Sequence, residues 1–227
     1  MRKDFIANAS HEMKTPISII SGYAESLIDG ILLPNERIEY EQTIYDEAQK
    51  MQKLVRDMLE IAILQNDKYE PHKSEVKLNE LIQKTLKRLI GQIKEKKLAV
   101  RVDSLEAVAA LVDESMLETV FVNFINNAIS HTVERGSIWI RLTQKSKAIR
   151  FEIENEGLPI PDDAISHIWE SFYRADKSHN REVGRFGLGL YAVKTIIEKH
   201  NGIVGVLNTE KGVLFYFEIP EHEVTKL

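Results

Sequence analysis

Residues 44–62 read IYDEAQKMQKLVRDMLEIA, and the spacing of their apolar side chains predicts a long helix. Apolar residues recur alternately at intervals of four and three, as a heptad seam requires. The seam comprises Ile44, Ala48, Met51, Val55, Met58 and Ala62. Leu54, Leu59 and Ile61 widen it into the broader apolar face typical of a helix bundle. We therefore predict one amphipathic helix over residues 36–65.

A second helix with similar spacing precedes it. Its apolar pattern runs from Arg2 to about Ile31, and Gly30 and Pro34 interrupt the pattern between the two helices. Two long helices with a short connection form an antiparallel hairpin. A lone hairpin cannot bury apolar faces of this length, so we expect two copies to pair into a dimeric four-helix bundle. The chain is predicted to be a homodimer.

The periodicity changes after this hairpin. Residues 67–74 contain a proline among polar residues and are typical of a linker. The pattern beyond them predicts helices over 79–97, 114–130, 162–171 and 188–200, and strands near 99–112, 137–142, 148–155, 202–208 and 212–220. The predicted domains are therefore a helical hairpin (1–66), a linker (67–74) and an α/β (α+β) sandwich with a mixed or antiparallel sheet (75–222).

Composition excludes several classes of protein. Of 227 residues, 43% are hydrophobic and 29% charged, which is ordinary for a globular protein. The absence of cysteine excludes disulfides and thiolate metal sites. A net charge of −5 without a basic stripe argues against nucleic-acid binding. The sequence shows no apolar run near 18 residues and no secretion leader, so we expect these residues neither to span a membrane nor to direct export.

The segment ASHEMKTP (9–16) places His11 on the first helix. At 100° per residue, His11 lies opposite the apolar side and shares its polar side with Thr15. An exposed imidazole beside a carboxylate, here Glu12, is a competent nucleophile because the acid can accept the second ring proton. Pro16 lies inside the helix and predicts a kink, which either fits the helix to a bundle or loosens the turn that carries His11.

Two features of the second domain are typical of phosphate chemistry. Gly187 and Gly189 open a predicted helix, where glycine lets backbone N–H groups approach a phosphate. Asn123 and Asn127 lie at i and i+4 on an otherwise apolar helix. Their amides either pack between helices or supply an oxygen to Mg²⁺ beside a triphosphate.

Five motifs, taken in order, resemble the cytoplasmic core of a two-component sensor histidine kinase, and the resemblance covers essentially the whole chain. FIANASHEMKTP (5–16) resembles the phosphoacceptor box, and NFINNAISHT (123–132) resembles the N box. ENEGLPIP (154–161) and GRFGLGLYAVK (184–194) resemble the two glycine boxes, and IWESFYR (168–174) the F box. The resemblance implies a dimerisation and histidine-phosphotransfer hairpin followed by a gyrase-like ATP-binding domain.

This resemblance also implies roles for individual residues. His11 would be the phosphorylated nucleophile and Glu12 its general base, while the hydroxyl of Thr15 would orient water in a phosphatase reaction. Asn127 would bind Mg²⁺, Asn155 would read adenine and Arg174 would neutralise charge on the transferred phosphoryl group. The remaining ATP-binding positions would be Asn123, His131, Gly157, Gly184, Gly187, Leu188 and Gly189, with residues 175–185 as a lid.

The implied function is an ATP-dependent protein-histidine kinase of a two-component signal-transduction system. It would autophosphorylate His11, pass the phosphoryl group to an aspartate of a response-regulator receiver domain, and dephosphorylate that regulator. The implied location is the cytoplasmic side, with the full-length protein anchored in the bacterial cell membrane through a sensor region before Met1.

Alternative functions remain open on the sequence. Ser130, Asn155 and Pro159 stand where the family usually has Lys, Asp and Gly, which allows a phosphatase-biased or nucleotide-impaired sensor of the same fold. A gyrase-like ATPase and a dimeric scaffold are alternatives from other classes.

Overall fold

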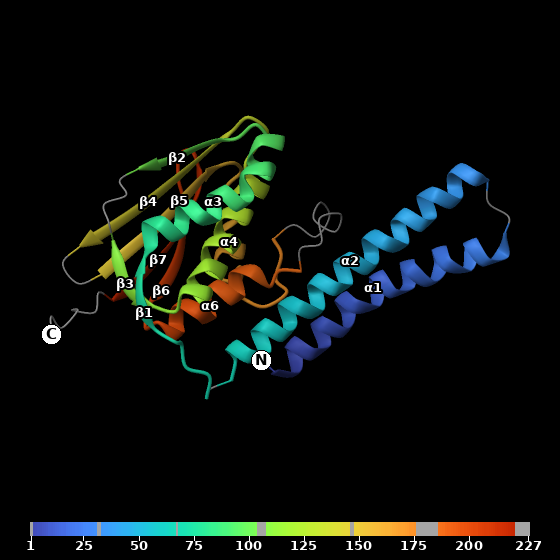
Figure 1. Cartoon of the computed structure of the whole chain (residues 1–227), viewed down its shortest axis with the longest axis horizontal. Helices are drawn as coiled ribbons and strands as arrows, with labels where there is room; N and C mark the ends of the chain where they lie inside the picture. The colour runs from blue at the N-terminus through green and yellow to red at the C-terminus, as the bar shows by residue number, and fades with distance from the viewer. Residues whose placement is uncertain are drawn as a thin grey trace. The chain divides into compact units, whose positions relative to one another are not determined.

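The computed structural model describes residues 2–30, 33–66, 68–103, 108–145, 148–175 and 186–220 (Figure 1). It contains two compact units. The first comprises Met1–Ile63 and Glu170–Leu188, and the second comprises Leu64–Trp169 and Gly189–Leu227. The domain bounds expected from the sequence, 1–66, 67–74 and 75–222, stay a prediction.

The first unit contains the predicted helical hairpin. Helices α1 (Arg2–Asp29) and α2 (Pro34–Leu64) run side by side in opposite directions (Figure 1). After α1 ends, Gly30 adopts a left-handed φ of 68°, a conformation that glycine tolerates best. At the start of α2 the Glu36 carboxylate accepts a hydrogen bond from Leu33 N at 2.8 Å, which satisfies a donor before the first turn. Glycine and this cap therefore fix where the two helices end and begin.

The hairpin buries only part of its apolar surface. Leu54 and Ile61 of α2 are fully buried, and Phe5 and Ala9 of α1 are largely buried. By contrast, Val55 of the predicted seam is 41% exposed, and other large apolar side chains of this unit are also exposed: Ile6, Ile17, Leu59 and Ile63. One apolar face therefore closes the hairpin, while a second face is left open. Helix α1 continues through Pro16, and a kink there stays a prediction.

The second unit is built on a mixed five-stranded sheet in the order β2-β4-β5-β7-β6. Its strands are β2 (Ala99–Asp103), β4 (Ser137–Lys145), β5 (Ala148–Glu156), β6 (Ile203–Asn208) and β7 (Gly212–Pro220). Strands β2 and β4 are parallel, and the other neighbours are antiparallel. Helices α3 (Leu78–Glu95), α4 (Glu114–His131) and α6 (Gly189–Lys199) cover one face of this sheet (Figure 1). The predicted α/β fold with a mixed sheet is confirmed.

The core between helices and sheet is aromatic. Phe121 and Phe124 of α4 pack on Phe151 of β5 and Phe217 of β7, and all four side chains are buried. The ring centroids of Phe151 and Phe217 lie 5.3 Å apart. Large buried rings contribute both apolar area and ring contacts, so this cluster holds α4 on the sheet.

The structure differs from the predicted elements in two places. Strand β1 (Ser74–Lys77), where only Ser74 falls in the predicted linker and no strand is predicted, pairs antiparallel with β3 (Ala109–Val112). Only Val76 of its four residues is buried, so the sequence carries no strand periodicity there. Helix α5 (Asp162–Ile165) ends well before residue 171. After α5 the backbone forms a turn in which His167 N donates to Ala164 O at 2.9 Å, a hydrogen bond between residues three apart.

Helix α6 and the start of α4 are joined by a buried histidine. His200 Nε2 accepts from Asp113 N at 3.0 Å, and its Nδ1 lies 2.8 Å from Ile196 O. Because Nε2 accepts, the ring is neutral with its proton on Nδ1. Burial lowers the pKa of His200, and the positive charge of Lys73 lowers it further, against the opposing effects of Ile196 O and Asp113.

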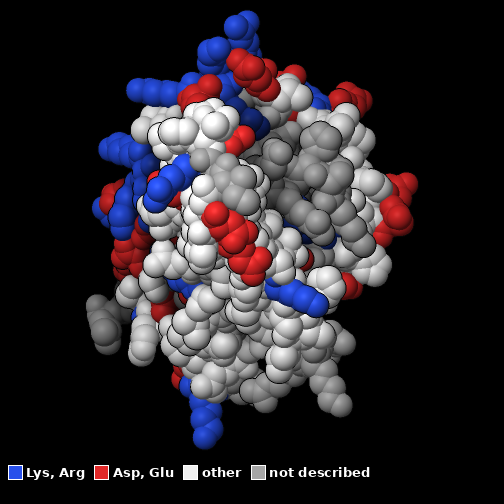
Figure 2. All heavy atoms as spheres, turned by 90° about the vertical axis from the view of Figure 1, so that its right-hand side faces the viewer, with Lys and Arg blue, Asp and Glu red and all other residues white. Residues whose placement is uncertain are grey.

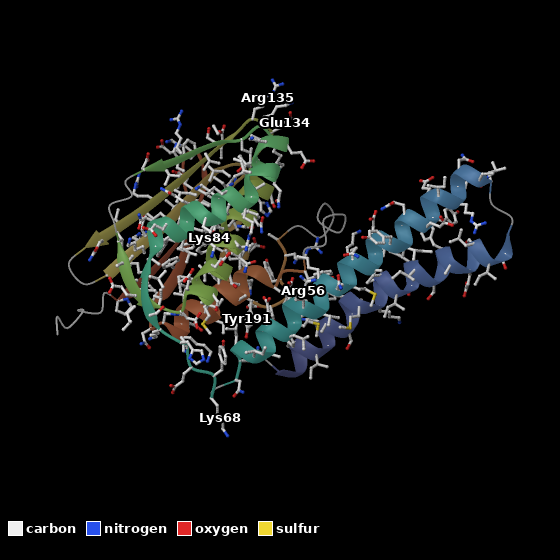
Figure 3. All side chains as sticks on the ribbon, viewed as in Figure 1. Arg56, Lys68, Lys84, Glu134, Arg135 and Tyr191 are labelled. Atoms are coloured by element: carbon white, nitrogen blue, oxygen red, sulfur yellow. The ribbon has the colours of Figure 1, made fainter. Side chains whose placement is uncertain are left out.

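The chain segment after α2 is bonded to α6. Gln65 Nε2 donates to the hydroxyl of Tyr191, which Figure 3 labels on α6, at 2.7 Å. Lys199 Nζ donates to Tyr69 O at 2.8 Å. These bonds fix the start of the second unit against its last helix.

The surface charges and the apolarity of the helices can be described for the residues that the structure contains. Figure 2 shows both basic and acidic side chains in the upper part of the face in view and few charged side chains in its lower part. Across the residues that the structure describes, no helix combines the length and apolarity needed to cross a bilayer.

Candidate functional site

Three predicted site residues lie on neighbouring turns of α1. His11 and Thr15 are exposed, as predicted, and Glu12 is half-buried. Residues four apart on a helix are neighbours on its surface, so the imidazole and the hydroxyl share one face. This face offers a nucleophile, an adjacent carboxylate and a hydroxyl to a reaction partner.

Helix α4 begins where Asp113 caps it. One carboxylate oxygen accepts from Met116 N at 3.1 Å and from Ser115 Oγ at 2.7 Å, and the other accepts from His72 N at 3.0 Å. Burial alone would raise the pKa of Asp113, but these hydrogen bonds outweigh burial and lower the pKa. The charged cap fixes the start of the helix that carries Asn123, Asn127 and His131.

The end of α4 is held by a lysine from the end of α3. Lys96 Nζ donates to three carbonyl oxygens: Ile129 O at 2.9 Å, Ser130 O at 2.8 Å and Thr132 O at 3.0 Å. Helix carbonyls at a C-terminus lack intrahelical partners and attract a cation. Lys96 therefore fixes the turn that contains His131.

One of the two α4 amides, that of Asn123, lies against the start of α6. Asn123 and Asn127 are half-buried, while neighbouring positions of α4 are buried and apolar. Gly189, the first residue of α6, is so close that a Cβ there would lie 2.8 Å from Asn123 Oδ1. Only glycine allows this approach without a shift, so the structure brings Asn123 and Gly189 together, as the resemblance implies.

A second cluster forms at the end of β5. Asn155 is 2% exposed. A Cβ on Gly157 would lie 2.6 Å from His131 O and 3.2 Å from Asn155 Nδ2. Three predicted nucleotide-binding residues, His131, Asn155 and Gly157, are therefore adjacent.

The second unit carries three side-chain amides at these positions, those of Asn123, Asn127 and Asn155, and each offers both a donor and an acceptor. The second unit therefore presents a polar site for a ligand with both donors and acceptors.

Other predicted positions lie in the first unit. Gly187 has a φ of 68°, and a Cβ there would lie 2.5 Å from Tyr173 O, so both conformation and space require glycine. Leu188 is buried, 3% exposed.

Arg174 has two buried guanidinium nitrogens, Nε and Nη2, without a hydrogen-bond partner. A buried cation of this kind suits an anionic ligand. Gly184 and most of the predicted lid lie outside the described residues.

The described residues contain no group of three or more His, Asp or Glu side chains arranged to hold a metal ion. Mg²⁺ needs fewer protein ligands, because it keeps waters and is commonly bound through one or two side chains plus phosphate oxygens. The amide oxygen of Asn127 is of the type it accepts, so the residues present fit a nucleotide-bound Mg²⁺.

Sequence reasoning missed the two residues that hold α4 in place. Asp113 carries a readable signal, because an aspartate immediately before an apolar helix is a favoured N-cap. Lys96 carries none, since its three carbonyl partners lie more than 30 residues away along the chain.

Comparison with known proteins places two family models on the chain. Residues 1–67 match the His Kinase A (phospho-acceptor) domain, and residues 112–223 match the histidine kinase-, DNA gyrase B- and HSP90-like ATPase. The sensor histidine kinase YclK of Bacillus subtilis is 33% identical over 96% of this chain. The chain spans 46% of the length of YclK.

Solved structures with the same fold include one complex with a response regulator and one complex with AMPPNP. The histidine kinase ThkA in complex with the response regulator TrrA aligns with a TM-score of 0.79 and 25% identity, covering 96% of this chain and 61% of that one. Full-length ShkA in complex with AMPPNP aligns with a TM-score of 0.69 and 26% identity, covering 96% of this chain and 46% of that one.

Proposed function

Because the chain belongs to the two-component sensor histidine kinase family, we propose that it autophosphorylates His11 from ATP and passes the phosphoryl group to a response regulator. The observation that carries this proposal is that one chain combines an exposed His11 beside Glu12 with the amides of Asn123, Asn127 and Asn155 inside the region that matches the ATPase family.

ATP binding is supported by the two clusters of the second unit. Asn155 sits nearly buried at the end of β5, where its amide oxygen can accept from the adenine amino group. Asn123 and the backbone at Gly189 form the second cluster, where N–H groups at a helix start suit the triphosphate. We assign His131, Gly157, Gly184, Gly187 and Leu188 to the same nucleotide.

The phosphotransfer step uses His11 as nucleophile. One imidazole nitrogen attacks the γ-phosphorus of ATP, Glu12 accepts the proton from the other nitrogen, and the bond to the β–γ bridging oxygen breaks to release ADP. Arg174 has unsatisfied guanidinium donors that suit the charge on the moving phosphoryl group. Mg²⁺, held through Asn127 and phosphate oxygens, would neutralise part of the triphosphate charge.

The second reaction passes the phosphoryl group to an aspartate. ThkA was solved with a response regulator, and we propose a receiver domain as the partner of this chain. Attack by the aspartate oxygen on the phosphorus of phospho-His11 breaks the P–N bond and returns the proton to the imidazole. Thr15 shares the face of His11, and in a separate phosphatase reaction its hydroxyl can orient a water that attacks the aspartyl phosphate and releases inorganic phosphate.

We propose that the active form is a homodimer. The open apolar face of α2, which includes Val55, supports this proposal because a lone hairpin leaves that face in water. The chain spans under half of YclK, and we propose that the full-length protein is anchored in the cell membrane with this region on the cytoplasmic side.

Incubation with γ-labelled ATP and Mg²⁺ tests the proposed function. Wild type should gain label that survives alkali and is lost in acid, which is the behaviour of a P–N bond, while His11→Gln should gain none. Release of free phosphate without labelled protein would instead support an ATPase. No label and no phosphate release, in protein that binds the nucleotide, would contradict the kinase proposal.

A further inference from the structure

The loop that follows Asn155 is attached to the turn between β6 and β7. Asn208, the last residue of β6, makes two hydrogen bonds to one backbone unit 48 residues away: Ile160 N donates to Asn208 Oδ1 at 2.8 Å, and Asn208 Nδ2 donates to Ile160 O at 2.8 Å. Both the oxygen and the nitrogen of the amide form hydrogen bonds, so the side chain holds the loop in one orientation.

The same turn contacts the loop at its other end. Gly157 N lies 3.4 Å from Lys211 O, its acceptor. A Cβ on Gly212 would overlap Asn155 O and would lie 2.7 Å from Gly157 N. Gly212 therefore permits a backbone approach that no other residue allows.

The turn is itself ordered by side-chain bonds. Thr209 N donates to Gly212 O at 2.8 Å, and Thr209 Oγ1 donates to the Glu154 carboxylate at 2.7 Å. Gly212 N donates in turn to Thr209 Oγ1 at 3.1 Å. A rigid turn is therefore positioned against both Asn155 and Ile160.

Between the two attachment points lie only Leu158 and Pro159. Leu158 is 89% exposed, so this stretch gains almost nothing from apolar burial. Pro159 restricts the backbone but has no N–H group and cannot donate a hydrogen bond. The position of the loop therefore depends on its hydrogen bonds to the β6–β7 turn.

We propose that Asn208 is a positioning residue for nucleotide binding, which holds the Gly157–Ile160 loop in the conformation that accepts the adenine end of ATP. This inference rests on the proposed function. A site whose loop is competent only part of the time binds with an apparent Kd equal to the intrinsic Kd divided by the competent fraction. Loss of the two hydrogen bonds from Asn208 should therefore weaken binding of the adenine end of ATP alone.

The test compares two ligands by calorimetric titration of the full chain: a non-hydrolysable ATP analogue and inorganic tripolyphosphate. Two neutral hydrogen bonds are lost in Asn208→Ala, so the ATP analogue should bind about tenfold more weakly. Binding of tripolyphosphate should stay at the wild-type value. A general loss of folded protein would lower the stoichiometry for both ligands instead.

Two further variants sharpen the test. Glu210→Ala changes an exposed side chain of the same turn and should leave both affinities unchanged. Asn208→Asp keeps the size of the side chain and the acceptor for Ile160 N but loses the donor to Ile160 O, so its affinity for the ATP analogue should fall between those of wild type and Asn208→Ala. Asn208→Asp also carries the test if Asn208→Ala does not fold.

Failure of this inference differs from failure of the proposed function. If wild type binds the ATP analogue and both Asn208 variants bind it as tightly, the positioning role of Asn208 is wrong while the kinase proposal stands. If tripolyphosphate affinity falls as much as that of the analogue, Asn208 acts on the fold and not on the adenine loop. If wild type binds no adenine nucleotide at all, the proposed function itself fails.

Discussion

Replacing Lys96 by methionine tests how the N-box helix is held. Lys96 Nζ donates to the carbonyls of Ile129, Ser130 and Thr132. Methionine keeps the apolar stem but leaves these carbonyls without the ammonium. A hydrogen bond to a charged group contributes about 1.5–3 kcal/mol. The three contributions do not add in full, because one ammonium makes all three bonds and water can hydrogen-bond to the carbonyls when the ammonium is removed. We expect Lys96→Met to lower the free energy of unfolding by about 2–3 kcal/mol.

The neighbouring Lys97 provides a matched control. Its ammonium pairs with Glu134 at 3.2 Å, and both side chains are about 60% exposed. Exposed pairs contribute little, so Lys97→Met should cost less than about 0.5 kcal/mol. Any effect of removing one positive charge from this region is common to both variants.

Tryptophan fluorescence during urea unfolding is the assay, because the two tryptophans, Trp139 and Trp169, both belong to the second unit. With a slope of roughly 1–3 kcal/mol per molar urea, the Lys96→Met midpoint should fall by about 1 M and the Lys97→Met midpoint by much less. Equal shifts in the two variants would refute the reasoning, because the three-carbonyl contact would then contribute nothing beyond its charge.

Four other predictions concern activity, assembly and pH. Thr15→Ala should keep autophosphorylation but slow dephosphorylation of the regulator by about tenfold or more, measured as decay of labelled aspartyl phosphate; a parallel loss of kinase activity would point to a damaged helix. Val55→Glu should dissociate the dimer in sedimentation whereas Gln52→Glu, at an exposed α2 position, should not; a Val55→Glu dimer would place the interface elsewhere. By calorimetry, Asn155→Ala should weaken and Asn155→Asp should tighten binding of an ATP analogue by about threefold to tenfold; wild-type affinity in Asn155→Ala would remove this residue from adenine recognition. His200 has a pKa below its unfolded value, so its contribution to stability is complete above about pH 6.5 and is lost as pH falls toward the folded pKa; urea unfolding of His200→Gln should show a flatter pH dependence in that window, and an unchanged slope would contradict the assignment.

Local patterns account for most of the fold. The seam at residues 44–62 predicts α2 because a heptad repeat determines which side chains share a face. The antiparallel pairing of β6 and β7 is predictable because Thr209–Gly212 is too short for anything but a tight turn, and the register places Asn208 opposite Val213. Strand β1 was missed because one buried side chain, Val76, makes no pattern.

Some residues of the apolar face of α2 are buried and others are exposed, and the sequence does not show which. Leu54 and Ile61, which widen the predicted face, are buried, while Val55 of the seam is exposed. Periodicity identifies an apolar stripe, but it does not say which edge of the stripe contacts which partner helix.

Within the candidate site, the motifs name His131, Asn155 and Gly157, and the structure places these three residues side by side. Their roles in nucleotide binding stay predictions. Lys96 and Asn208 are polar residues without any local signature, and their roles come from backbone groups distant in sequence. Such contacts appear only when the chain is folded.

The proposed kinase activity requires phosphorylation of His11, and mass spectrometry of the digested protein tests this requirement most directly. The full chain, incubated with ATP and Mg²⁺, would be digested with trypsin at alkaline pH, where a phosphoramidate is stable. Residues 4–14 form one peptide that contains His11 and none of the other six histidines. We expect a single phosphoryl group on this peptide, located on the His11 imidazole and lost after acid treatment. A phosphoryl group on another peptide, or an unmodified 4–14 peptide from protein with bound nucleotide, would contradict it.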